Sequence, residues 1–401
     1  MAESQASQET LLSAILYAHS QINEPFCYAI CRIFECHPRL ADNDQAFRIL
    51  AWYVEYGNVA TEGASEESRI EQEIVNIDHL TERGGALKLR GSYADRGAAA
   101  EALGAVIWEC PSRLQDAIDI LSRRVMDEHV LSIRCCLTRS IYSVLRYDNR
   151  RAAELLKRLV IRPQGVELVP LTTHEGFNAL SYILRGAPEI GIELVDLLLR
   201  SSKEDQKLIG AFHLFREAFY NSVLTERANA LINLSDGHRN LAAHVAATHF
   251  RYAEYRSRAE SQLMAFFDDP AKGVRAAAAD CFRDLQSGDL HFCRGLLRMF
   301  IKSKAFEEEN FPFFYFLKEA CDQTFEEVVL ASERLVKLIE ENIKQATADI
   351  DLHYLDELIR REYAAVANQP ELRRRLLDVI DRMLELGLYG TEQIIQEHER
   401  I

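Results

Sequence analysis

The sequence predicts an all-α protein, a right-handed α-solenoid in which about eight to ten helical hairpins stack side by side. Three observations lead to this fold class. Apolar residues recur at helical spacing through most of the 401 residues, and one dipeptide register repeats along the middle of the chain. The composition, with 48% hydrophobic residues and nine prolines, is that of an ordered chain, and no apolar run approaches the roughly 18 residues that a membrane span needs.

The repeated register consists of six dipeptides whose first residues lie 38, 41, 32, 32 and 36 positions apart. Five of the six second residues are basic, and the residue four positions after each of them is Ala or Thr. A small residue at a fixed helical position allows a neighbouring helix to approach closely, so this pattern indicates stacked hairpins. The dipeptides are Asp95-Arg96, Ile133-Arg134, His174-Glu175, Gln206-Lys207, His238-Arg239 and Val274-Arg275.

The turn before the last dipeptide predicts where a hairpin passes from its first helix to its second. Asp268 or Asp269 can accept free backbone N–H groups at a helix start, and Pro270 suits the first helical turn. A small-residue run, 276–279, then gives the second helix a thin face. In the same way, Thr172 with Glu175 is expected to form a capping box.

The sequence pattern predicts three regions. Residues 1–90 are expected to form an N-terminal helical cap or subdomain, residues 91–303 the repeat array, and residues 304–401 C-terminal capping repeats with an acidic outer face. The connection 162–171 contains Pro163, Gly165 and Pro170 and is expected to project as a loop. The aromatic run 311–316 is expected to lie mostly in the core, with at least one ring exposed.

Charge and cysteine content narrow the possible partners and the compartment. The net charge of −15 argues against a general binder of nucleic acid or anionic membranes, because such binding neutralises phosphate. Only residues 101–300, with 26 basic and 25 acidic residues, are balanced enough to host a basic surface. The nine cysteines are an odd number set among apolar residues, and no basic segment opens the chain, so we expect reduced thiols and a cytoplasmic protein.

The register and the turn 267–274 resemble those of HEAT and armadillo-like α-solenoids, most clearly over residues 91–303. The segments 96–104, 267–274 and 370–390 are also similar to the HEAT-like C-terminal regions of bacterial ATP-binding proteins, some of which are anti-phage or signalling NTPases. Those proteins carry a phosphate-binding loop, and no Gly-x-x-x-x-Gly-Lys-Ser/Thr occurs here. The resemblance therefore implies a helical module, and the ATPase activity of those proteins cannot be carried over to this chain.

The sequence gives no positive sign of a cofactor, a metal site or enzymatic chemistry. Cys27, Cys31, Cys36 and His37 form the densest set of soft ligands, but two of the thiols lie one helical turn apart among apolar residues, as in a core. His238, His244 and His249 do not have the i, i+4 spacing of a metal-binding helix. No nucleophile elbow or dinucleotide fingerprint is present.

The basic members of the register are the candidate site. They are Arg96, Arg134, Lys207, Arg239 and Arg275. They could form a ladder that binds an acidic peptide or phosphate from a partner. They could instead pair within the chain, with carboxylates such as Asp127, Asp268 and Asp269, and fix the stack. The second interpretation is favoured, because the repeat alone places these side chains and carboxylates lie nearby.

We therefore expect a non-enzymatic scaffold or adaptor in the cytoplasm that holds another protein on its solenoid surface. One alternative is the sensor or regulatory module of a bacterial NTPase defence or signalling system. A third is a nucleic-acid binder or DNA glycosylase, since some HEAT-like folds are alkylpurine DNA glycosylases, although the acidic charge makes nucleic acid unlikely.

Overall fold

The computed structural model describes residues 2–20, 27–58, 80–320, 324–342, 357–361, 363, 366 and 369–387. Within them nearly all regular structure is helical, which confirms the all-α fold class. The chain comprises two compact units, residues 1–217 and 218–401. The proposed division at residues 90 and 303 stays a prediction. In the described part of the chain, no helix is long and apolar enough to cross a membrane.

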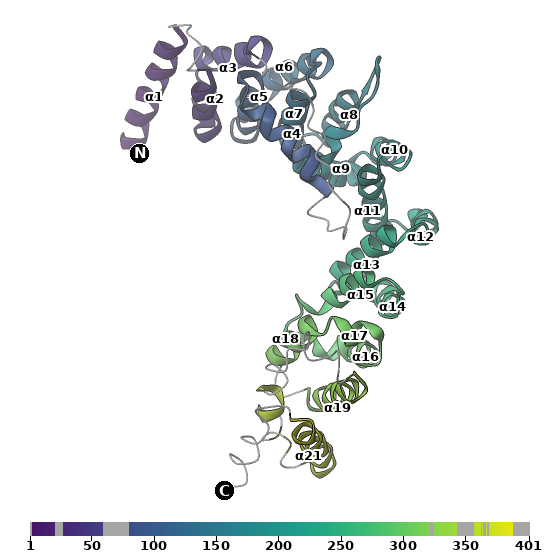
Figure 1. Cartoon of the computed structure of the whole chain (residues 1–401). Coiled ribbons are helices and arrows are strands. Elements are labelled where there is room, and N and C mark those ends of the chain that lie inside the picture. The colour runs from purple at the N-terminus through teal and green to yellow at the C-terminus, as the bar shows by residue number, and fades with distance from the viewer. Residues whose placement is uncertain are drawn as a thin grey trace. The chain divides into compact units, whose positions relative to one another are not determined.

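Unit 1 contains two rows of helices that are neighbours in space (Figure 1). In the first row, α2 packs on α5, α5 on α7 and α7 on α9; in the second, α3 packs on α6, α6 on α8 and α8 on α10. The helices are α1 (Ala2–Ser20), α2 (Cys27–Cys36), α3 (Asp44–Tyr56), α4 (Glu82–Ser92), α5 (Asp95–Glu109), α6 (Leu114–Asp127), α7 (Leu131–Val144), α8 (Asn149–Val160), α9 (His174–Gly186) and α10 (Pro188–Leu199), followed by α11 (Glu204–Tyr220), which contains the unit boundary.

Small residues bring α5 and α7 together, as the register predicts. A methyl group on Gly104 of α5 would lie 3.1 Å from the amide nitrogen of Ser140 on α7, so the backbones nearly touch. The Ser140 hydroxyl donates to the carbonyl of Ala100 at 2.6 Å. This hydrogen bond takes the place of the hydrogen bonds to water that the close approach excludes. Ala100 and Thr138, two of the small register residues, are fully buried.

The connection 162–171 folds into a small hairpin and a 3₁₀ turn. Strands β1 (Ile161–Arg162) and β2 (Gly165–Val166) pair antiparallel, and η5 (Val169–Thr172) leads into α9. The expected cap at Thr172 is wrong: the side chain of Thr173 caps α9, accepting from the amide of Gly176 at 2.9 Å. Thr172 lies in η5, where its hydroxyl donates to the Val169 carbonyl, and the helix therefore begins one residue later.

Unit 2 continues with paired helices around an aromatic core. Here α13 packs on α15 and α15 on α17, while α14 packs on α16, α16 on α19 and α19 on α21. The helices are α12 (Thr225–Ile232), α13 (Asp236–Phe250), α14 (Arg256–Phe266), α15 (Lys272–Ala279), α16 (Leu290–Ile301), α17 (Lys304–Glu308), α18 (Phe311–Glu319), α19 (Phe325–Asn342) and α21 (Pro370–Glu385).

The centre of this core is Phe300, fully buried, whose ring centroid lies 4.8 Å from that of Phe282 and 5.3 Å from that of Phe313. The expectation for the aromatic run 311–316 is confirmed. Phe313, Phe314 and Phe316 are buried, whereas Phe311 and Tyr315 are exposed. The run thus turns one face of α18 to the core and leaves two rings on the surface.

The turn before α15 works differently from the expected cap. Helix α15 begins at Lys272 without a side-chain cap; Asp269 instead accepts from the amide of Ala271 at 2.9 Å and so fixes the turn itself. Asp268 accepts from the amide of Lys304 at 2.9 Å and therefore caps the first residue of α17. The acidic pair serves two neighbouring hairpins rather than one helix start.

Candidate interaction surface

All six register dipeptides lie in the first turn of a helix, namely α5, α7, α9, α11, α13 and α15. Because the first turn of each helix meets the preceding turn of the chain, the second residue of the dipeptide is placed beside backbone carbonyls and carboxylates of its surroundings.

In unit 1, the ladder side chains of α5 and α7 form hydrogen bonds with carboxylate and carbonyl groups of the same chain. Arg96 donates to Glu128 at 3.2 Å and to the Gly57 carbonyl at 3.1 Å. Burial alone would raise the pKa of Glu128, but the Val130 amide, Arg124 and Arg96 together lower it. Arg134 is 5% exposed and donates to the Leu159 carbonyl. Arg96 thus joins α5 to the segments that follow α3 and α6, and Arg134 joins α7 to α8.

The remaining side chains of the ladder also contact groups of the same chain. In unit 2, Arg239 forms a two-nitrogen contact with Asp269, at 2.8 and 3.3 Å, and a further one with Asp236 at 2.7 Å. Arg275 donates to the carbonyls of Asp269 and Pro270 and to the carboxylate of Glu308. Lys207 in unit 1 is more exposed and lies 3.4 Å from Glu204, one turn earlier on its own helix. Whether any of these cations also binds a partner stays a prediction.

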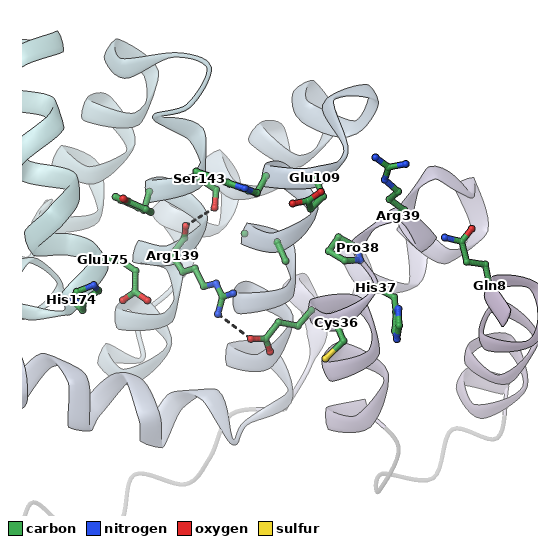
Figure 2. A pocket seen from close by; sticks show the side chains of 15 residues that line it. Gln8, Cys36, His37, Pro38, Arg39, Glu109, Arg139, Ser143, His174 and Glu175 are labelled. Atoms are coloured by element: carbon green, nitrogen blue, oxygen red, sulfur yellow. Dashed lines mark hydrogen bonds and ion pairs between the residues drawn. The ribbon is translucent and has the colours of Figure 1, made fainter. Parts of the chain in front are cut away.

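A different surface of unit 1 has the features of a binding site. A cavity of about 730 Å³ opens along the first row of helices (Figure 2). We call the surface of this row the cavity face. Helices α2, α5, α7 and α9, the turn η2 (Pro38–Asp42) and Gln8 of α1 supply the walls of the cavity. Its lining includes Glu35, Cys36, Trp108, Arg139, Tyr142 and Glu175.

An alternating row of charges runs along the cavity face and joins five helices. Arg139 of α7 donates through one nitrogen, Nη1, to Glu35 at 3.0 Å and to Glu101 at 3.1 Å. The Lys88 ammonium of α4 lies 3.3 Å from Glu101 and contacts Glu175 of α9. We call this set the charge row; its members are Arg32, Glu35, Arg139, Glu101, Lys88 and Glu175.

The protonation of the charge row follows from its burial. Burial raises the pKa of Glu101, and the opposing cations Lys88 and Arg139 offset this only in part. Burial would lower the pKa of Lys88 and of Arg139, but the facing carboxylates raise both above their ordinary values. Lys88 and Arg139 therefore keep their charge at neutral pH.

The charge row leaves hydrogen-bonding capacity at two places. Within the described residues, Nε and Nη2 of Arg139 have no hydrogen-bond acceptor, and its side chain is 36% exposed in the cavity. Oε2 of Glu175 is buried and accepts no hydrogen bond from the part of the chain that the structure describes. A ligand that carries acceptors for Arg139 and a cationic donor for Glu175 would satisfy these hydrogen-bonding groups.

Aromatic side chains border the cavity. Trp108 is 42% exposed, and the guanidinium carbon of Arg146 lies 4.8 Å from its ring centroid. The hydroxyl of Tyr147 and Nη1 of Arg146 both donate to the Trp108 carbonyl, which fixes the end of α5. Exposed Trp with neighbouring Arg is the composition that dominates the energetics of protein interfaces.

The soft-ligand candidates do not come together as a metal centre. Cys31 is buried and donates to the Asp95 carbonyl, whereas Cys36 is exposed at the cavity and is followed by His37. His249 packs against Phe219 with ring centroids 4.4 Å apart and contacts the Tyr220 hydroxyl. Among the described residues, no group of three or more His, Cys, Asp or Glu side chains is arranged to hold a metal ion.

Comparison with known proteins adds no family. No family model and no curated protein matches the chain. The solved structures that match include an engineered protein, which is 12% identical; the alignment covers 92% of this chain and 97% of that one, with a TM-score of 0.32.

Proposed function

We propose that the chain is a non-enzymatic scaffold of the HEAT-like, right-handed α-solenoid type, and that it holds a partner protein on the cavity face of unit 1. The observation that carries this proposal is the cavity of about 730 Å³, built by side chains from successive helices of one row. Repeats that present equivalent helices side by side offer a partner a long, continuous surface.

The chemistry of the cavity supports a protein partner. Trp108 and Tyr142 supply aromatic area, and Glu35 and Glu101 hold the Arg139 guanidinium, two nitrogens of which donate to no residue that the structure describes. A pre-positioned Arg costs little side-chain entropy on binding, and an exposed Trp buries a large area.

A comparison of the two tryptophans of the chain tests this function. Trp108→Ala should weaken binding of a purified partner at least tenfold, since truncation of a central interface Trp costs about 2 kcal/mol or more. Trp52→Ala is the matched control, because Trp52 on α3 is 44% exposed, nearly the same as Trp108, and does not line the cavity. Equal losses for the two variants, or no loss for Trp108→Ala, would place the partner elsewhere.

The alternatives from the sequence stay predictions, as does a cytoplasmic address. A regulatory module of an NTPase predicts that a phosphate-binding loop is encoded in the neighbouring reading frame or in an extension of this one. Nucleic-acid binding predicts an affinity that falls steeply with added salt.

A further inference from the structure

Helix α4 differs from every other helix of unit 1 in how it is held. It lies across the first row, in contact with α5, α7 and η5 (Figure 1). Its buried residues are the glycines Gly84 and Gly91, whereas Leu87 is half-buried and Leu89 is 58% exposed. No large apolar side chain of α4 is buried among its described residues, so the hydrophobic effect contributes little to its position.

The sequence of α4 is also a weak helix former. Three of its eleven residues are glycine, and each glycine in a helix interior costs about 1 kcal/mol relative to alanine. The side chain of Thr81 at the helix start makes no capping hydrogen bond. A helix with poor propensity and little apolar burial belongs to the least stable elements of a fold, which open without global unfolding.

Polar and backbone contacts hold α4 instead. The ammonium of Lys88 bridges Glu101 of α5 and Glu175 of α9, and the thiol of Cys136 on α7 donates to the Lys88 carbonyl at 3.3 Å. A methyl group on Gly91 would lie 2.4 Å from the Ser132 carbonyl oxygen, so the two backbones are in direct contact. Lys88 is thus the main anchor, and it satisfies carboxylates that belong to the first row.

From these contacts, and resting on the proposed function, we propose that α4 is a detachable strap over the cavity face. Its place can be taken by a partner helix that carries a lysine among small residues. The charge row supports this occupant, because without Lys88 the buried carboxylate of Glu101 and the half-buried carboxylate of Glu175 lie close together with only Arg139 to offset them. Glycine contacts such as those of Gly84 and Gly91 require a small-residue partner surface.

Two adjacent cysteines report the opening of the strap. Cys136 is fully buried beneath α4, where its sulfur would be 3.0 Å from a methyl group on Gly91. Cys135 is equally buried, but adjacent side chains of a helix point about 100° apart, so it does not face α4 in the same way. Alkylation rates of the two thiols, measured by mass spectrometry on the intact chain, separate local opening from global unfolding.

Two variants should move the Cys136 rate in opposite directions. Lys88→Met should speed its alkylation about tenfold, because α4 loses its charged contacts with Glu101 and Glu175, while the Cys135 rate stays unchanged. Gly85→Ala should slow it about two- to fivefold, since a methyl group there meets nothing within 4 Å and alanine favours the helix. Lys157→Met is the control: it removes an ion pair between α8 and α10 and should change neither rate.

A synthetic peptide tests the occupant. An isotopically heavy peptide of residues 80–93, in excess over wild-type chain, should increase hydrogen exchange of the chain's own α4 amides, and the peptide with Lys88→Gln should not. If Cys135 and Cys136 accelerate together, or if neither responds to Lys88→Met and Gly85→Ala, α4 is not a strap. If the variants respond but neither peptide acts, or both act equally, the lysine-bearing occupant is refuted. These outcomes are independent of the Trp108 comparison, which alone decides whether a partner uses the cavity.

Discussion

Replacing Arg275 by Met should destabilise unit 2 locally, because this side chain joins three parts of the chain. It is 8% exposed as a side chain and donates to the carbonyls of Asp269 and Pro270 and to the carboxylate of Glu308. The contacts link the turn before α15 to α17. Met keeps most of the buried aliphatic volume, so the change removes mainly the charged donors.

The expected loss can be bounded from these contacts. A hydrogen bond to a charged group contributes about 1.5–3 kcal/mol, but bonds made by one side chain are not additive. Glu308 is 36% exposed, so water replaces much of the lost ion pair. We therefore assign the loss mainly to the two carbonyl contacts and expect about 3 kcal/mol in total.

Native-state hydrogen exchange of the α15 and α17 amides measures this loss. Arg283→Met is the matched control, because Arg283 is 65% exposed and its one ion pair among the described residues is with Asp280, one turn away, so we expect less than about 0.5 kcal/mol. Both tryptophans, Trp52 and Trp108, lie in unit 1, and their fluorescence checks that unit 1 stays native. Protection of α15 and α17 that falls no further in Arg275→Met than in Arg283→Met would refute the structural role of the ladder.

Two further changes test unit 1. Burial, and after it the neighbouring charge of Arg216, holds the pKa of His213 well below its ordinary value. The unfolded chain therefore takes up a proton below about pH 6.5 that the folded chain excludes. The free energy of unfolding should therefore fall as the pH drops below about 6.5, by at most about 1.4 kcal/mol at pH 5.5. Urea unfolding of His213→Leu should lack this contribution to the pH dependence. Gly176→Ala should cost more than about 2 kcal/mol, because the added methyl group would lie 2.0 Å from the Pro170 carbonyl oxygen. Urea titration followed by circular dichroism measures the free energy of unfolding of each variant. Gly288→Ala is the control and should be close to wild type, because nothing lies within 4 Å of the added methyl group.

The all-α class was predictable because apolar residues recur at helical spacing and small residues recur at one helical position. The small residues Ala100 and Thr138 are needed wherever two helices approach, so they recur at a fixed position and can be read without a structure. Details of the turns were not predictable. Thr172 and Thr173 both offer a capping hydroxyl, and only the 3₁₀ turn η5, set by its packing on α4 and α7, decides between them.

The candidate surface was largely missed, since it combines side chains from helices far apart in sequence. Lys88 and Glu175 are 87 residues apart, and nothing local connects them. Two signals were present. Glu101 is a lone charge in the otherwise small and apolar segment 98–107, and Glu175 is the exception in a register of basic residues. An acidic residue where the repeat supplies a cation indicates that something else supplies the cation, and here it is Lys88.

A crosslink from the cavity tests the central claim most directly. Cys36 is exposed and lines the cavity, so a photoreactive group attached there lies at the proposed binding site. The same group on Lys157→Cys, in a chain with Cys36→Ser, samples α8 in the second row. If the cavity face binds the partner, the Cys36 probe crosslinks to it, the crosslink is lost in Trp108→Ala, and the α8 probe gives none. A crosslink from α8 alone, or one from Cys36 that persists in Trp108→Ala, would contradict the account.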